Sequence, residues 1–273
     1  MNRRARTLLV NGALLLLALA VLAPLAWMVS VSLMAKGEAA QAPAPLIPAA
    51  ATLVQYRSLF NDYAIGRPML NSVGVALLAT AASLIFTVPA GYAFAKLRFR
   101  GRELLLRTLV ALLVVPGQVA MLPLFLMLKQ VGLVNSYAGV VAPWLAGIFG
   151  TLFVRQAALS LPDEMLDAAR IDGAGEAQIF RFIVEPLLRP ITVTLALFTF
   201  LGSWNDFLWP LIVLADDHLY TLPVALATLS REHTQDAELM MAGAVVTTVP
   251  VLLVFLPLQR FYIGGLLGGS IKG

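Results

Sequence analysis

The sequence predicts an all-α, polytopic membrane protein with six transmembrane helices. Sixty per cent of the residues are hydrophobic and only 12% are charged, which is typical of a membrane protein rather than a soluble domain. Several uncharged runs are long enough to cross about 30 Å of hydrocarbon, for which a helix needs roughly 20 residues. These runs are continuously apolar and do not alternate, so helices are expected rather than the strands of a barrel.

The six predicted spans follow one another along the whole chain and form a single transmembrane domain over residues 1–273. Their bounds are roughly 8–34, 68–95, 106–128, 137–156, 190–215 and 239–262. The first run follows Arg3, Arg4 and Arg6, like the core of a signal peptide, but it is about twice as long as such a core. We therefore expect an uncleaved first helix.

The basic residues predict the orientation. If the amino terminus is inside, the inside segments contain 14 of the 19 lysines and arginines and the outside segments contain five. This positive-inside bias places both termini and residues 160–190 in the cytoplasm. The same distribution explains the net charge of +4 without nucleic-acid binding, since the basic residues are scattered and lack interleaved stacking aromatics. The chain has no cysteine, which excludes disulfides and thiolate sites and leaves the compartment open.

Residues 160–190 form a charged, helix-prone segment between apolar runs. Ser160 suits the cap of a short helix, Pro162 its first turn and Asp163 the positive end of its dipole. Gly173 is the residue best able to adopt a positive φ, so a turn is expected there. An apolar stripe at helical spacing and then two stopping prolines complete the segment: Ile179, Phe180, Ile183, Val184 and Leu187, with Pro186 and Pro190. From these residues alone, the segment is either a docking element or an amphipathic hairpin on the membrane surface.

The same segment resembles the EAA loop of ABC importer permeases, in which Glu-Ala-Ala is followed at fixed spacing by Gly, Ile and Pro. The matching positions here are Asp167, Ala168, Ala169, Asp172, Gly173, Ala174, Phe180, Ile183 and Pro186. The chain departs from the pattern at Asp167, which replaces the usual Glu, and at Glu185, where Leu is common. The resemblance implies that this segment is a short cytoplasmic coupling-helix loop that docks on an ATPase.

The second half resembles the carbohydrate-uptake, maltose-permease-like branch of that family. The similar stretches are 204–210, Trp-Asn-Asp-Phe-Leu-Trp-Pro, then 220–224, Tyr-Thr-Leu-Pro-Val, and a glycine-rich tail that ends in Ser270, Ile271, Lys272 and Gly273. The resemblance implies a bacterial inner-membrane importer with a second homologous permease, two ATPase subunits and an extracytoplasmic solute-binding protein. It also implies that Ser270, Ile271 and Lys272 contact the ATPase pair, whereas a frayed terminus is the alternative.

The chain has no G-x-x-x-x-G-K-[ST] phosphate loop, so it is not expected to bind ATP in that way. We expect no catalytic residues, no metal and no cofactor in this subunit, with ATP and Mg²⁺ bound by the partner ATPases. The acidic outer loop 216–238 contains His218 and His233, yet no pair lies at i, i+4. A solvated or protein-contacting loop is therefore preferred over a metal site.

Asp206 is an ionisable group within an apolar run and needs a partner or a watery path. With Asn205 it either lines the translocation path or hydrogen-bonds a neighbouring helix. A proton-coupled secondary transporter is the alternative function, and Asp206 would be its candidate relay. An intramembrane enzyme is disfavoured, because the runs contain no histidine and the chain has no Gly-x-Ser-x-Gly.

Overall fold

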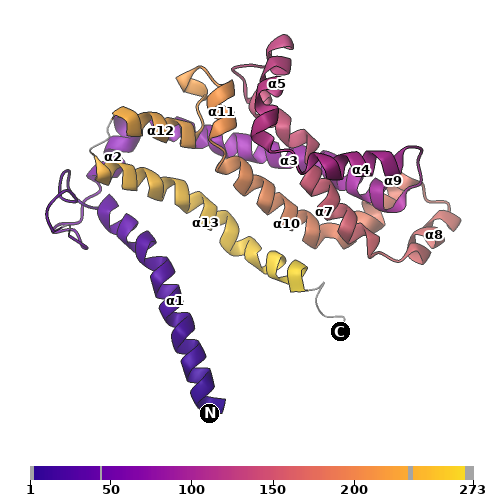
Figure 1. Cartoon of the computed structure of the whole chain (residues 1–273), viewed down its shortest axis with the longest axis horizontal. Helices are drawn as coiled ribbons and strands as arrows, with labels where there is room; N and C mark the ends of the chain where they lie inside the picture. The colour runs from indigo at the N-terminus through magenta and orange to yellow at the C-terminus, as the bar shows by residue number, and fades with distance from the viewer. Residues whose placement is uncertain (1–2, 44, 233–235, 268–273) are drawn as a thin grey trace. The chain divides into compact units, whose positions relative to one another are not determined.

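The computed structural model describes residues 3–43, 45–232 and 236–267, and every regular element in these ranges is a helix (Figure 1). The predicted all-α class is confirmed. In chain order the elements are α1 (Arg3–Ser32), α2 (Val54–Asn61), α3 (Gly66–Lys96), α4 (Arg102–Leu112), α5 (Gly117–Gln130), α6 (Tyr137–Val141), the 3₁₀ turn η1 (Ala142–Ala146), α7 (Ile148–Leu159), α8 (Asp163–Ile171), α9 (Glu176–Ile179), the π turn η2 (Phe180–Val184), α10 (Glu185–Trp204), α11 (Leu208–Val213), the 3₁₀ turn η3 (Asp217–Leu219), α12 (Leu222–Glu232) and α13 (Ala237–Leu267).

Five helical stretches in the described part of the chain are long and apolar enough to cross a membrane. They are Thr7–Ser32, Gly66–Lys96, Tyr137–Leu159, Glu176–Trp204 and Ala237–Gln259. A sixth span results if α4 and α5, which pass the same test together, are counted as one. The structure of the described residues therefore contains five to six apolar spans, which is consistent with the predicted six.

The third predicted span, 106–128, is not one straight helix. The pair α4 and α5 is bent by 110°, and residues 113–116 separate the two helices. Pro116, with a ψ of 130°, precedes α5 and lacks the N–H that would continue the helix from α4. A proline also disfavours helical geometry in the residue before it, so the bend lies at Pro116.

The fifth predicted span, 190–215, is displaced in the structure. One continuous helical stretch runs from Glu176 to Trp204, passing through the π turn η2, and α11 follows after a break at 205–207. Pro186 and Pro190 were expected to stop a helix, and that expectation is wrong. At η2 the Glu185 N–H donates to the Phe180 carbonyl, five residues back, and this wider turn accommodates the missing N–H of Pro186.

The chain divides into two compact units, which are described separately. The first comprises Met1–Arg67 and Ala225–Pro250. Its core includes Met34, Leu59 and Leu239. Buried carboxylates order its loop: Glu38 accepts hydrogen bonds from the Ala35 and Ala49 N–H groups at 3.0 and 2.6 Å. Most apolar side chains of α1 are exposed, as suits a helix that faces lipid or another subunit.

The second unit comprises Pro68–Val224 and Val251–Gly273 and has one apolar cluster near each end of α3. The cluster at the carboxyl end of α3 packs Tyr92 with residues of α7, α8, α9 and α10. The other cluster packs Val75 with residues of α5, α6 and α11. Close approach of α3 and α7 depends on Gly91, where a Cβ would lie 2.6 Å from Cβ of Val154.

Candidate functional site

The turn between α8 and α9 is centred on Gly173, as the sequence predicts. Gly173 has a φ of +86°, a left-handed conformation that favours glycine. Its N–H donates to the Arg170 carbonyl at 3.0 Å, and the Ala174 N–H donates to the Ala169 carbonyl at 3.0 Å. This pair of bonds is a Schellman motif, which satisfies the last carbonyls of α8 and reverses the chain.

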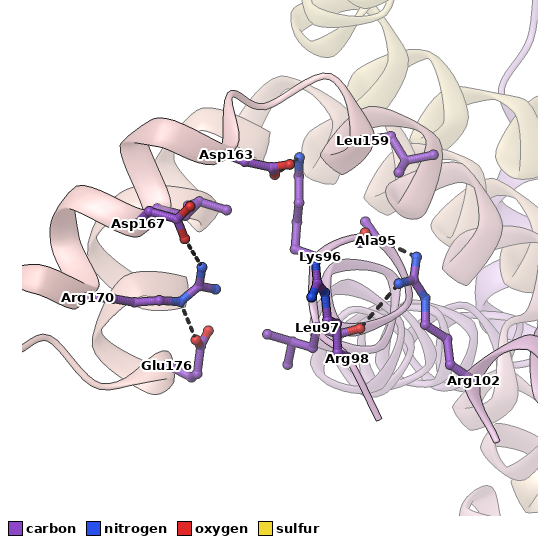
Figure 2. Close-up of a pocket in the computed structure, with 11 residues that line it drawn as sticks. Ala95, Lys96, Leu97, Arg98, Arg102, Leu159, Asp163, Asp167, Arg170 and Glu176 are labelled. Carbon is purple, nitrogen blue, oxygen red and sulfur yellow. Dashed lines mark hydrogen bonds and ion pairs between the residues drawn. The ribbon is translucent and has the colours of Figure 1, made fainter. Parts of the chain in front are cut away.

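Arg170 joins the two sides of this turn (Figure 2). Its guanidinium bonds Glu176 of α9 at 2.8 Å and Asp167 of α8 at 2.7 Å. The hydrogen bond to Glu176, followed by that to Asp167, raises the pKa of Arg170. The second oxygen of Glu176 accepts from the Tyr92 hydroxyl of α3 at 3.0 Å. The turn is thereby fixed to the carboxyl end of a long apolar helix.

Lys96 makes a second connection between α3 and the segment. Its ammonium group donates to the Leu161 carbonyl and contacts Oδ1 of Asp163, both at 2.6 Å. The lysine side chain is only 7% exposed, whereas Asp163 lies at the surface. Hydrogen bonding and charge attraction from Lys96 lower the pKa of Asp163. The first turn of α8 is therefore held by an ion pair as well as by packing.

These charged side chains line a cavity of about 830 Å³ between α3, α4 and α8 (Figure 2). Its basic members are Lys96, Arg98, Arg102 and Arg170, and its acidic members are Asp163, Asp167 and Glu176. The Arg102 guanidinium bonds the carbonyls of Phe94, Ala95 and Leu97 at 3.0–3.4 Å and so caps α3. Most of these charges bind one another or the backbone, an arrangement that fixes α8 in place.

The other side of the turn presents apolar groups to the surroundings. Ile171 is 86% exposed and Phe182 is 71% exposed. Beside them is a hollow of about 370 Å³, lined in part by Asp172, Gly173 and Gln178. We call Ala168, Ile171, Asp172, Gly173 and Phe182 the turn surface. Exposed apolar side chains grouped around a rigid turn are typical of a protein-docking site.

The nine predicted coupling residues divide into two groups. Those on the surface are Asp167, Ala168, Asp172, Gly173 and Pro186. The others pack against the apolar cluster beneath the turn: Ala169, Ala174, Phe180 and Ile183. Leu166, Ile179, Val184 and Leu188 form the buried base of that cluster. The motif thus combines a presented face with an anchoring face.

Two local expectations for this segment need correction or addition. Ser160 does not cap α8, because its hydroxyl donates to the Ala157 carbonyl at the end of α7 and Pro162 occupies the cap position. Sequence reasoning also missed the positioning residues Arg170, Glu176, Tyr92 and Lys96. For the bonds of Arg170 to Asp167 and Glu176, the available signal in the sequence was the spacing of these three residues around the turn.

Asn205 and Asp206 are adjacent in sequence but have different surroundings in the structure. Asn205 donates from Nδ2 to the Leu201 carbonyl at 2.8 Å and lies exposed at the end of α10. Asp206 is half-buried and accepts from the Trp209 N–H at 3.4 Å, at the start of α11. It lines a cavity of about 460 Å³ with Trp144 and Trp209.

The predicted outer loop lies at the opposite end of α3 from the turn. Asn71 donates to the His218 and Tyr220 carbonyls at 3.0 and 2.9 Å. Ligand atoms of Asp216, Asp217 and His218 lie within 4.8 Å of one another, but all three residues are exposed. Exposed acidic groups often cluster without a metal, so this arrangement does not alter the expectation of a solvated or protein-contacting loop. His233 and the tail residues Ser270, Ile271 and Lys272 lie outside the described residues.

The chain is similar to known proteins of one family. Residues 84–263 match the family described as "Binding-protein-dependent transport system inner membrane component". The chain is 40% identical over 203 residues to an arabinooligosaccharides transport system permease protein of Halalkalibacterium halodurans, covering 74% of this chain and 73% of that protein. It is 31% identical over 271 residues to a trehalose transport system permease protein of Mycobacterium tuberculosis, covering 98% and 95%.

The fold is also similar to a solved structure. A chain of a bacterial ABC transporter involved in the import of the acidic polysaccharide alginate superposes with a TM-score of 0.84. The two chains are 24% identical, and the match covers 96% of this chain and 99% of that one. The likeness therefore extends over nearly the whole chain.

Proposed function

We propose that this chain, which belongs to the family of binding-protein-dependent transport system inner membrane components, is the permease subunit of an ATP-driven ABC importer for a carbohydrate. The observation that supports it best is the turn surface, where a rigid glycine turn presents exposed Ile171 and Phe182 beside an anchored helix. The names of the relatives, which include arabinooligosaccharide, lactose and trehalose permeases, support the substrate class.

In this proposal the turn surface docks on an ATPase. Asp167, Ala168, Ala169, Asp172, Gly173 and Ala174 form or support the docking turn, and Phe180, Ile183 and Pro186 follow it. ATP and Mg²⁺ are bound by the ATPase partners, and this subunit contributes no catalytic group. ATPase closure moves the turn, which biases the permease between two states.

The remaining partners are a second homologous permease and an extracytoplasmic solute-binding protein. The acidic outer loop meets the binding protein, because its carboxylates are exposed and lie at the opposite end of α3 from the turn. The protein resides in the bacterial inner membrane, surrounded by lipid, with both termini in the cytoplasm. Ser270, Ile271 and Lys272 reach the ATPase pair, and Asn205 and Asp206 belong to the translocation path.

Reconstitution tests the function. The chain is co-expressed with its candidate ATPase, second permease and binding protein and placed in proteoliposomes. Uptake of lactose, trehalose and arabinotriose is then measured. We expect uptake of at least one sugar that requires both ATP and the binding protein. Uptake that a protonophore abolishes while ATP is present would support the secondary-transporter alternative instead.

A variant in the turn surface tests the coupling role. Ala168→Asp adds a charge at an exposed position and leaves the buried base intact. We expect insertion and assembly of the membrane subunits to persist while ATP-dependent uptake falls at least tenfold, since a charge buried unpaired in an interface costs more than about 1.4 kcal/mol. Ala51→Asp, at an exposed position in the segment between α1 and α2, is the matched control. Equal uptake by the two variants would contradict the docking assignment.

A further inference from the structure

Three interruptions in the helices of the second unit meet at the cavity that contains Asp206. The α4–α5 break contributes Val115, the 3₁₀ turn η1 contributes Trp144, and the break after α10 contributes Asp206. Non-helical backbone at membrane depth is tolerated only where protein buries it or where it lines a watery cavity. Discontinuous helices of this kind commonly form the substrate sites of transporters.

Asp206 is the ionisable residue among the described residues that line this cavity. Its recorded hydrogen bond is the long one from the Trp209 N–H, at 3.4 Å. A carboxylate has about four acceptor positions, so most of its capacity is unused. Keeping a carboxylate among apolar side chains is costly, and a ligand that donates hydroxyl groups would offset that cost.

Two tryptophans form aromatic walls of the cavity. Trp209 is fixed, because it is 3% exposed and its indole N–H donates to the Gly139 carbonyl at 3.1 Å. Trp144 is partly exposed, and its ring lies against Gly202, where a Cβ would come within 2.9 Å of Cη2. Within the described part of the chain, no hydrogen-bond partner is recorded for the Trp144 indole N–H. This ring is therefore positioned by Gly202 and available to a ligand.

We propose that this cavity is a carbohydrate subsite of the translocation path, in which Asp206 accepts hydrogen bonds from sugar hydroxyls and Trp144 packs against the C–H face of a sugar ring. The proposal deepens the proposed function and rests on it. A sugar combines hydroxyl donors with apolar faces, which matches one carboxylate beside an aromatic wall. The volume of about 460 Å³ also falls within the roughly 300–1,000 Å³ of small-molecule sites. Trp144 and Asp206 are then specificity-determining residues.

The test is whether a sugar protects an introduced cysteine from a thiol reagent. The chain has no natural cysteine, so labelling reports only on the introduced one. Ala120 lines the cavity, whereas its neighbour Val119 does not line it and is 66% exposed. Ala120→Cys and Val119→Cys are compared in the assembled transporter, in lipid nanodiscs, with a thiol reagent whose product on this chain is read by mass spectrometry. The probes are lactose, trehalose and arabinotriose, with choline as an organic cation.

We expect the transported sugar to slow labelling of Ala120→Cys and to leave Val119→Cys unaffected. Adding Asp206→Asn should raise the sugar concentration for half-protection about tenfold, the size expected for a lost charged hydrogen bond. Trp144→Ala should also raise this concentration, because the sugar ring loses its aromatic wall. Trp144→Phe, which keeps a ring, should raise it less. Asp62→Asn and Trp27→Ala, at exposed positions in the first unit, are the controls and should leave it unchanged. Co-purification of all subunits confirms assembly of each variant.

Four results would overturn the subsite. They are normal ATP-dependent sugar uptake without protection, protection unchanged in both Asp206→Asn and Trp144→Ala, protection by choline alone, and labelling of Ala120→Cys in the isolated chain but not in the transporter. The last would show that another subunit fills the cavity. Failure of the proposed function looks different, since the parent transporter would then show no ATP-dependent uptake of any of the three sugars.

Discussion

At the scale of single residues, Gly173 and Gly101 have the same backbone geometry in different settings. Their φ values are +86° and +83°, and neither would bring a Cβ within 4 Å of another group. A substitution by alanine therefore costs the same left-handed strain at both positions, about 1–2 kcal/mol. Only Gly173 lies in the turn surface. Comparing the two alanine variants therefore distinguishes the effect of backbone strain from an effect on docking.

We predict that Gly173→Ala lowers the amount of sugar transported per ATP hydrolysed, whereas Gly101→Ala does not. The turn relaxes away from φ +86° in the first variant and shifts the docking side chains around it. Uptake and phosphate release are measured together in proteoliposomes. Equal coupling ratios for both variants would show that the precise turn geometry is unimportant.

The ion pair between Lys96 and Asp163 predicts a pH-dependent contribution to stability. Because Lys96 lowers the pKa of Asp163 in the folded state, the pair stabilises the fold above the ordinary aspartate pKa, near 3.9, and loses this effect as pH falls through the lowered value. Asp163→Asn should therefore lower the unfolding temperature at pH 7, with the difference narrowing below about pH 4.

Tryptophan fluorescence melts in detergent, recorded for the parent and the variant at each pH, measure this difference. Glu164→Gln, in the same helical turn, is the control, since no ion pair is recorded for Glu164 in the described ranges. A parent–variant difference that stays constant from pH 7 to acid would contradict the ion-pair account.

The residues also show how far a sequence can predict a site. Gly173 was predictable, because a positive φ is a local requirement. The bonds of Glu176 to Tyr92 and of Lys96 to Asp163 were not, because they join residues 84 and 67 positions apart. Only packing of α3 against the segment brings those groups together. For these two long-range bonds, the sequence offered only the position of a charged Lys96 at the end of an apolar run.

At the scale of elements, the prolines show why local rules failed. Pro116 behaves as its chemistry predicts and ends a helix. Pro186 lies inside a continuous stretch, because the π turn before it changes the hydrogen-bond register. The register of a neighbouring turn is set by packing of Ile179, Val184 and Leu188 in the cluster beneath, which proline position alone does not reveal.

The outer loop gives the prediction that belongs to this scale. Asp217 is 82% exposed, and Asp216 accepts the His218 N–H at 2.9 Å, a bond that asparagine can also accept. The double variant Asp216→Asn with Asp217→Asn should keep the loop conformation but weaken stimulation of the ATPase by the binding protein at low salt. The difference should vanish at high salt, because exposed charges are screened.

ATPase activity against binding-protein concentration, at two salt concentrations, measures this effect. Asp62→Asn removes a different exposed carboxylate and is the control. Equal half-saturation for the parent and the double variant at low salt would mean that the binding protein contacts another surface.

At the scale of the whole molecule, composition and run length were sufficient for the all-α membrane class and gave a number of spans consistent with the five to six in the structure. They were insufficient for the bends, since a run of apolar residues has the same hydropathy whether it is straight or turned by 110°. The breaks at 113–116 and 205–207 bring Val115 and Asp206 to one cavity. Asp206 was recognisable from its charge, but its neighbours Trp144 and Trp209 required the three-dimensional arrangement.

Orientation gives a whole-molecule prediction. A cysteine at Asp62, in the turn after α2, should react with an impermeant reagent from outside sealed cells. A cysteine at Ala177, exposed in α9, should react only after permeabilisation, because the positive-inside bias places it in the cytoplasm. Ala177 is preferred to Glu176, whose carboxylate bonds Arg170 and Tyr92. External labelling at 177 would reverse the orientation and contradict ATPase docking.

The continuous helical stretch from Glu176 to Trp204 is long enough to turn a small tilt into a large displacement of its end. Its 29 residues, at about 1.5 Å each, measure about 43 Å, so a tilt of about 5° moves one end by about 4 Å relative to the other. One end of this helix adjoins the turn surface, and the other end lies beside Asp206. In the proposed docking, a small angular motion of the ATPase would therefore be enough to widen or narrow the cavity. The π turn η2 lies near the end beside the turn surface, and the helix can bend there. The stiffness of η2 would set how much of the motion at the turn surface reaches Asp206.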